Sequence, residues 1–289
     1  MFGECHAHVI MDGKNYKKAV QMHYDGVKDE VIHAFFQTYK EQEITFIRDG
    51  GDAGGVSRRA KEIAPMYGID YRTSVFAIHK EGEYGSIVGR SFRNMKEYHE
   101  RVKEAIAEGA DFIKIMTTGL MDFDNNGKVT GTPLPFAEVK EMVHIAHEEG
   151  MAVMSHTNGE YGFRTALEAG VDSIEHGNFI NAGVVAELAD SNSLWVPTLV
   201  TVRNLMGCGR YSDEVLRPIA ECAAENVCES FRKKAKLALG SDAGAYMVPH
   251  TSGTVDEWNA FKELLGDTPE VDQWLKDGEA QIKERFKRS

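Results

Sequence analysis

The stretch Phe112-Ile113-Lys114-Ile115-Met116 places a lysine in the middle of an apolar run that has the composition of a buried strand. Burying a charged, unpaired lysine is costly, so Lys114 must snorkel, form a buried ion pair, or be neutral for a functional reason. One functional form is the carbamate, made when carbon dioxide adds to the amine. A carbamate has two oxygens and can bridge two divalent metal ions. Lys114 alone leaves these alternatives open.

Working outward from Lys114, residues of the types that bind metals stand at the ends of other apolar runs. Two histidines at positions i and i+2 of a strand point to the same face. In a (β/α)8 barrel the carboxyl ends of all strands meet at one face, where metals and substrates bind. The sequence therefore predicts a metal centre formed by Lys114 together with His6, His8, His156, His176 and Asp242.

The order of elements along the chain also favours this fold. Short apolar runs alternate with amphipathic stretches, which is typical of parallel α/β proteins. We predict one (β/α)8 TIM-barrel domain over residues 1–289, with an extra C-terminal helix over 268–289. The eight predicted strands lie near 2–10, 43–50, 70–78, 110–117, 151–157, 171–177, 194–202 and 235–242.

Local signals predict several helix ends. Asn94 with Glu97 and Thr254 with Glu257 have the spacing of capping boxes. One apolar stripe, followed by Gly150, consists of Val139, Met142, Val143 and Ala146. The long loops near 79–93, 118–135 and 203–213 are expected to shape a binding site.

One motif resembles a calcium site but lacks a required ligand. Asp122-x-Asp124-x-Asn126-Gly127 resembles the start of a calcium-binding EF-hand loop, but Pro133 occupies the position that requires glutamate. We interpret it as a hairpin with an Asn126-Gly127 turn over the active face. Asp49 is expected to organise its loop and not to bind metal.

Composition excludes several classes of function. A hydrophobic content of 42% and a charged content of 27% are those of a soluble globular protein. The formal net charge of −12 disfavours nucleic acid and anionic membranes as partners. The four cysteines fit no zinc or disulfide pattern, and neither a signal peptide nor a membrane-spanning run is evident. We expect a cytoplasmic protein that acts on a small molecule.

The order of these motifs resembles the amidohydrolase superfamily, in particular its imidazolonepropionase-like and prolidase-like branch. The matching stretches run from the first predicted strand to the eighth. They are His6-Ala7-His8, Phe46-Ile47-Arg48-Asp49-Gly50-Gly51, the 109–116 segment around Lys114, Ile174-Glu175-His176-Gly177, Val196-Pro197-Thr198-Leu199 and Gly240-Ser241-Asp242-Ala243-Gly244.

The resemblance implies a distorted barrel with one or two divalent metal ions. His6, His8 and Asp242 would bind the more buried ion, His156 and His176 the more exposed one, and carboxylated Lys114 would bridge both. Zinc suits these ligands, and manganese, cobalt, nickel or iron could occupy the same site.

The sequence departs from that branch in two respects. Members usually carry a small β-sandwich beside the barrel, whereas only five residues precede His6 here. We therefore expect a barrel-only member, for which self-association as a homo-oligomer is one way to cover the exposed edge. The second departure is His156-Thr157-Asn158-Gly159, where the branch often has His-x-His-Gly. Asn158 thus replaces a substrate-contacting histidine.

The resulting hypothesis is hydrolysis by a metal-bridging hydroxide, with Asp242, Lys114 and His176 as the catalytic set. Asp242 would take a proton from the hydroxide and pass it to the leaving group. The substrate would be an amide, lactam or lactone of a small molecule, or an acyl-amino acid or dipeptide. Candidate substrate contacts are Asn158, Tyr246, His250, Arg203 and the further loop arginines Arg90, Arg93 and Arg210.

Two alternatives remain open from the residues. A mononuclear deaminase or decarboxylase could use the same scaffold without a carboxylated lysine. Deaminases of the superfamily typically carry His-x-x-Glu on the fifth strand, whereas Glu160 here follows His156 by four residues. A barrel in which metal only stabilises the fold is the other alternative.

Overall fold

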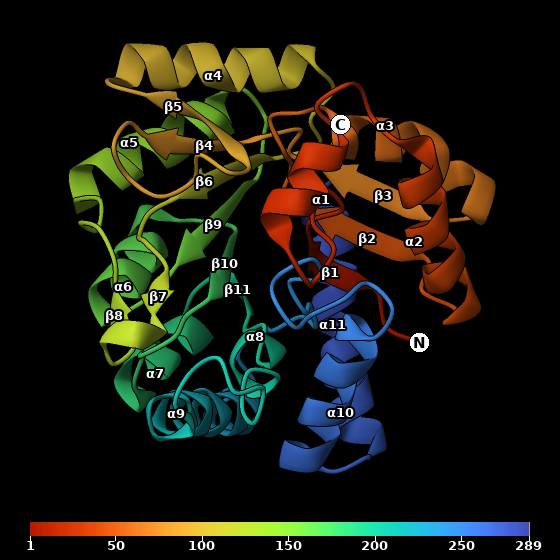
Figure 1. Ribbon diagram of the computed structural model, residues 1–289. Helices are drawn as coiled ribbons and strands as arrows, with labels where there is room; N and C mark the ends of the chain where they lie inside the picture. The colour runs from red at the N-terminus through yellow and green to blue at the C-terminus, as the bar shows by residue number, and fades with distance from the viewer. Residues whose placement is uncertain (289) are drawn as a thin grey trace.

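The strands form two main parallel sheets in the computed structural model, which describes residues 1–288 (Figure 1). The smaller sheet has the order β1-β2-β3, with bounds Glu4–Ala7, Phe46–Asp49 and Asp70–Thr73. The larger has the order β11-β10-β9-β6-β4-β5, with bounds Leu194–Val196, Ser173–His176, Val153–Thr157, Ile113–Met116, Ala77–Lys80 and Gly89–Phe92. In both sheets each strand is parallel to its neighbours.

Backbone hydrogen bonds join the two sheets on both sides. On one side the Asp111 N–H donates to the Thr73 carbonyl at 2.8 Å. On the other, residues 236–243 run between β11 and β1: the Ala238 N–H donates to Trp195 at 3.0 Å and the Asp242 N–H to His6 at 2.8 Å. The arrangement fits the predicted (β/α)8 barrel and brings the carboxyl ends of the strands to one face.

Three of the eight predicted strands were wrong in detail. The predicted strand over 194–202 ends at Val196, and a helix begins at Val200. The predicted loop over 79–93 was also wrong in part, because it contains β5. The predicted strand over 70–78 divides into β3 and β4, which belong to different sheets, because the chain bends at Val75 with φ 65°. Residues 235–242 contain one isolated bridge, at Leu237, and no regular strand. At Gly240 a Cβ atom would lie 2.8 Å from the His6 nitrogen, so this segment approaches β1 too closely for an ordinary side chain.

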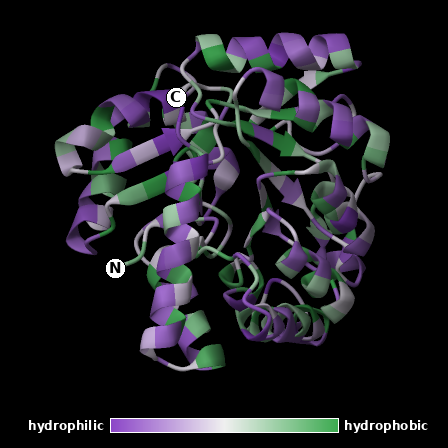
Figure 2. Cartoon of the chain, turned by 180° about the vertical axis from the view of Figure 1, so that it is seen from behind, coloured by the Kyte–Doolittle hydropathy of each residue, from purple (hydrophilic) through white to green (hydrophobic). Residues whose placement is uncertain are grey.

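Helices surround the sheets (Figure 1). They are α1 (Tyr16–Met22), α2 (Asp29–Glu41), α3 (Val56–Ile63), α4 (Met95–Ala107), α5 (Phe136–Glu148), α6 (Glu160–Ala169), α7 (Ala182–Asp190), α8 (Val200–Arg203), α9 (Asp213–Arg232), α10 (Gly253–Leu265) and α11 (Pro269–Arg285). Short 3-10 turns cover Ala64–Tyr67 and Phe123–Asn125. Figure 2 shows hydrophilic and hydrophobic residues mixed along these helices, as expected for elements with one face toward the core. Within residues 1–288, no helix combines the length and apolar character needed to cross a membrane.

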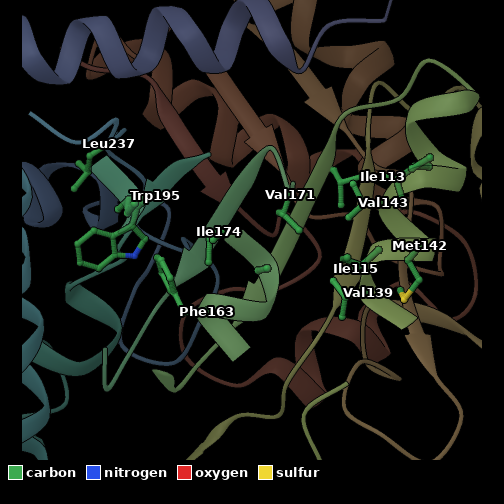
Figure 3. Packing of buried hydrophobic residues seen from close by; sticks show 14 of the residues in the cluster. Ile113, Ile115, Val139, Met142, Val143, Phe163, Val171, Ile174, Trp195 and Leu237 are labelled. Carbon is green, nitrogen blue, oxygen red and sulfur yellow. The ribbon is translucent and has the colours of Figure 1, made fainter. Parts of the chain in front are cut away.

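The core between β6 and α5 confirms the apolar stripe. Val139 and Met142 are buried in the same cluster as Ile113 and Ile115, and Figure 3 shows the four side chains together. Fully burying each such side chain stabilises the fold by about 1.5–3 kcal/mol. Lys114, between the two isoleucines, consequently points to the opposite face of β6, into the barrel.

Of the two predicted capping boxes, one is confirmed and the other is wrong. The Asn94 side chain accepts from the Glu97 N–H and caps α4, as predicted. The second capping box was wrong, because α10 begins at Gly253 and Thr254 lies inside it. The Thr254 hydroxyl donates to Glu4, and the Glu257 carboxylate accepts from the Leu199 and Val200 N–H groups. Thr254 and Glu257 therefore bond to buried partners elsewhere in the fold and do not cap the helix.

The predicted hairpin is confirmed, and so is the C-terminal helix, although it ends at Arg285 and residue 289 of its predicted range lies outside the described residues. β7 (Met121–Asp122) pairs antiparallel with β8 (Lys128–Val129), and Asn126 and Gly127 both have positive φ. Helix α11 covers the end of the barrel away from the ligand-type residues. Its Ile282, with Phe286 just after it, packs on Cys5, Phe46 and Phe112.

Candidate active site

All six residues of the predicted metal centre line one cavity. Ligand atoms of His6, His8 and Asp242 lie within 4.8 Å of one another. The Lys114 Nζ lies 3.5 Å from His6 Nε2. The His176 ring is 5.1 Å from the His6 ring and 4.6 Å from the His156 ring, between centroids. Residues far apart in the sequence thus converge at the carboxyl ends of β1, β6, β9 and β10.

His6 is supported from below by a buried ion pair. Its Nδ1 lies 3.0 Å from Glu175 Oε2, and Glu175 also accepts from the Arg48 guanidinium at 3.0 and 3.1 Å. Arg48 further donates to Ser173 Oγ and the Cys5 carbonyl, each at 2.7 Å. A carboxylate on the far nitrogen of a histidine orients the ring and raises its basicity as a ligand. The Glu175 carboxylate therefore lies beside Nδ1 of His6, which makes no hydrogen bond among the described residues, while Nε2 faces Asp242 and Lys114.

His8 stands on a loop organised by Asp49. The Asp49 carboxylate accepts from the Val9 and Gly51 N–H groups, both at 2.7 Å, and Gly51 O lies 3.4 Å from His8 Nδ1. Burial raises the pKa of Asp49 to about 7. The placement agrees with the expectation that Asp49 organises the loop.

Asp242 has the strongest signs of a ligand. Its φ of 60° is in the left-handed region, a strained conformation for a non-glycine residue that is often found at functional sites. Its Oδ1 is buried without a hydrogen-bond partner among residues 1–288, 3.6 Å from His6 Nε2 and 3.8 Å from His8 Nε2. Burial raises the pKa of Asp242 well above its usual value. A divalent cation between these atoms would satisfy the orphaned oxygen, so the donor set fits a metal ion.

His156 and His176 are held by neutral groups. His156 Nε2 lies 3.1 Å from the Gly119 carbonyl, so Nε2 carries the proton and Nδ1 keeps its lone pair. His176 Nδ1 lies 2.8 Å from Thr198 Oγ1, which leaves Nε2 for a ligand. His176 also has positive φ, 69°, and Trp195 Nε1 donates to its carbonyl at 2.9 Å.

The electrostatics favour neutral ligands throughout this cluster. Burial lowers the pKa of His6 and His176 well below the usual value, and that of His8 and His156 to about 3. Burial also lowers the pKa of Lys114 to about 8. Neutral imidazoles and a neutral amine have the free lone pairs that metal binding and carbamate formation require.

Two carboxylates beneath the site were missed by reasoning from the sequence. Glu4 is fully buried and accepts from the His6 N–H at 3.0 Å, the Ser241 N–H at 2.8 Å and the Thr254 hydroxyl at 2.8 Å. It therefore ties β1 to the segment that carries Asp242. The available signal was its position two residues before His6 on the same strand face. Glu257, read as a capping residue, instead supports the turn after β11.

The cavity has a volume of about 330 Å³. Among the predicted substrate contacts, Asn158 and Tyr246 line it, whereas His250 and Arg203 do not. The Asn158 Oδ1 accepts from Asn178 at 2.9 Å. His250 lies behind the site, where its ring nitrogens bond to Tyr39 and the Met11 carbonyl. Arg203 is ion-paired with Glu263. Arg210, one of the other loop arginines, lines the cavity.

Residues 44–264 match the amidohydrolase family. The chain belongs to this family. Among curated proteins, an uncharacterised protein of Mycobacterium tuberculosis is 31% identical over 113 residues, which are 37% of this chain and 30% of that protein. Ochratoxinase of Aspergillus niger is 25% identical over 154 residues, which are 51% of this chain and 32% of that enzyme. The matches therefore span about a third of the length of these relatives.

Two solved structures share the fold. A prolidase complexed with N-methylphosphonate-L-proline superposes with a TM-score of 0.77 at 20% identity, covering 98% of this chain and 74% of that one. Ochratoxinase of A. niger gives a TM-score of 0.77 at 18% identity, covering 99% and 71%. These similarities establish the fold of this family member. They do not identify its substrate, which has to be inferred from the residues of the site.

Proposed function

We propose that this amidohydrolase is a metal-dependent hydrolase that cleaves an amide, lactam or lactone of a small molecule, including acyl-amino acids and dipeptides. The observation that carries the proposal is the orphaned Asp242 Oδ1, buried beside two neutral histidines and a buried lysine. The similarity to a prolidase and to ochratoxinase supports hydrolysis as the reaction class.

The chain's residues divide into two ligand groups for divalent metal, most simply zinc. His6, His8 and Asp242 would hold the more buried ion, and His156 and His176 the more exposed one. Such ions supply a hydroxide nucleophile near neutral pH and polarise the scissile carbonyl. Imidazole and carboxylate ligands also accept manganese, cobalt, nickel or iron.

Lys114 would bridge the two groups as a carbamate. Its amine is buried, and the lowered pKa increases the neutral fraction that reacts with carbon dioxide. Carboxylation converts a buried cation into a buried anion, which supplies the negative charge that two adjacent cations need.

Asp242 would be the general acid–base. Its carboxylate lies at the ligand cluster and accepts the proton of the attacking water. Once protonated, it would return that proton to the leaving nitrogen or oxygen. Glu175 places a negative charge beside His6, and Thr198 orients His176 through a hydrogen bond to its Nδ1.

No observation on the described residues favours the deaminase alternative. Glu160, the nearest acidic residue after His156, begins α6, and its carboxylate pairs with Asn181 and Arg164. It is therefore engaged away from the cavity.

Metal content tests the proposal. Elemental mass spectrometry on protein purified without chelator should give near two metal ions per chain for the wild type and fewer for Lys114→Ala. Near one ion in both proteins would remove the bridging role of Lys114. Absence of any turnover by metal-loaded protein on amide, lactam and lactone panels would instead favour a metal that only stabilises the fold.

A further inference from the structure

The loop arginines differ in whether they are paired. Arg90 is paired with Glu108, Arg93 with Glu97 and Arg203 with Glu263. Arg210 forms no ion pair with any of residues 1–288. It also lines the cavity, with Lys114 as the only other Lys or Arg among the described lining residues.

Aromatic rings hold Arg210 in place. Its guanidinium carbon lies 4.6 Å from the Tyr246 ring centroid and 5.0 Å from that of Tyr211. Such cation–π contacts attract the guanidinium to the rings and leave its N–H donors without a hydrogen-bond partner among the described residues. Two parallel N–H groups match the two oxygens of a carboxylate. Arg210 is exposed to solvent and lines the cavity, so its donors are available to an anionic ligand there.

The rest of the cavity wall is largely apolar. It includes Ile87, Val88, Met116, Leu120, Phe123 and Leu205. Among the described lining residues the one carboxylate is that of Asp242, which the proposed function assigns to metal and proton transfer. A substrate ammonium would find no spare carboxylate on this wall. Burial chiefly, with a smaller contribution from Asp124 at the hairpin, raises the pKa of Tyr211, but Asp124 does not line the cavity.

We propose that Arg210 binds the carboxylate of an N-acyl amino acid with an apolar acyl group, and that the site discriminates against dipeptides with a free α-ammonium. This inference rests on the proposed amide hydrolysis and specifies its substrate class. Water adds to the acyl carbon, the C–N bond breaks, and the proton from water passes to the leaving nitrogen. The products are the acyl carboxylate and the free amino acid. The apolar wall holds the acyl group, and Arg210 holds the amino-acid end.

Steady-state kinetics with three matched compounds test the proposal. They are N-benzoyl-L-leucine, its C-terminal carboxamide, and the dipeptide Phe-Leu, each assayed with metal-loaded wild type, Arg210→Gln and Arg210→Lys. The matched control is Arg93→Gln, which removes a paired arginine outside the cavity. A charge-assisted hydrogen bond to a carboxylate corresponds to about 10- to 100-fold in binding.

We expect wild type to prefer N-benzoyl-L-leucine over both other compounds by about 10-fold or more in kcat/KM. Arg210→Gln should raise KM for that compound while leaving kcat and the carboxamide reaction nearly unchanged. Arg210→Lys should be intermediate, and Arg93→Gln should equal wild type. Equal kcat/KM for Phe-Leu and N-benzoyl-L-leucine would contradict the proposed discrimination against substrates with a free α-ammonium. An unchanged KM in Arg210→Gln would overturn the role of Arg210.

A binding measurement separates this inference from the proposed function. The probe is 4-phenylbutanoate, which has an apolar end and a carboxylate but no bond to hydrolyse, and calorimetry gives its Kd. Weaker binding to Arg210→Gln than to wild type and Arg93→Gln would support the anion subsite even if no amide were cleaved. Equal Kd values in all three proteins would overturn the subsite, whatever the activity.

Discussion

The two groups of candidate ligands are supported in different ways. Behind His6 stand charged groups, Glu175 and Arg48, buried without exposure to solvent. Behind His156 and His176 stand neutral groups, the Gly119 carbonyl and the Thr198 hydroxyl. A carboxylate donates more electron density to a histidine ligand than a hydroxyl does, and its buried ion pair resists displacement. The difference indicates that the His6 group would bind metal more tightly, while the second group could exchange it more readily.

Asp242→Asn is expected to have the largest effect on catalysis. The amide keeps the size of the side chain but cannot accept the proton, so kcat should fall by about 10²- to 10⁴-fold. The measurement is single-turnover kinetics at matched metal occupancy. Turnover near the wild-type level would exclude Asp242 as the proton acceptor.

Glu175→Gln tests the charged support. It leaves Arg48 buried without its counter-charge, a change that destabilises by about 3–5 kcal/mol. Metal affinity at the His6 group should fall by about 10- to 100-fold. Urea unfolding of the chelated protein gives the first value and metal titration the second. Wild-type metal affinity in a folded variant would show that the carboxylate does not support His6.

Thr198→Val tests the neutral support with a smaller expected effect. It removes the hydroxyl near His176 at similar side-chain volume, and loss of one neutral hydrogen bond costs about 1 kcal/mol. Occupancy of the second metal should fall while the first is kept, as measured by metal content during stepwise dialysis. A loss larger than that of Glu175→Gln would reverse the comparison between the two groups.

The pH dependence of stability sharpens the comparison further. Glu257 supports the turn that carries Thr198, and burial raises its pKa to about 8. The folded state therefore binds this proton more tightly than the unfolded state. The corresponding stability is fully present below the unfolded pKa, near 4.5, and is lost as pH rises through about 8. In chelated protein, Glu257→Gln should flatten this decline, and an equally steep decline in both proteins would assign it to other groups.

Much of the fold followed from local pattern. The stripe on α5, the Asn94 cap and the Asn126-Gly127 hairpin depend on spacing and backbone preference, which act over a few residues. The irregular segment 235–242 and the break at Val75 could not be predicted from local sequence pattern. They arise where the chain packs closely on a distant segment, and no short window of sequence contains that information.

The sequence by itself determined which residue types stand at the strand ends, since parallel strands share one end at which such residues must meet. It could not distinguish Arg210 from the other loop arginines, or identify Glu4 and Glu257 as buried supports. Those assignments depended on which partners lie within a few ångströms. Ion pairs and burial are properties of the folded arrangement, so only the tertiary structure decided that three arginines are neutralised while one lines the cavity unpaired.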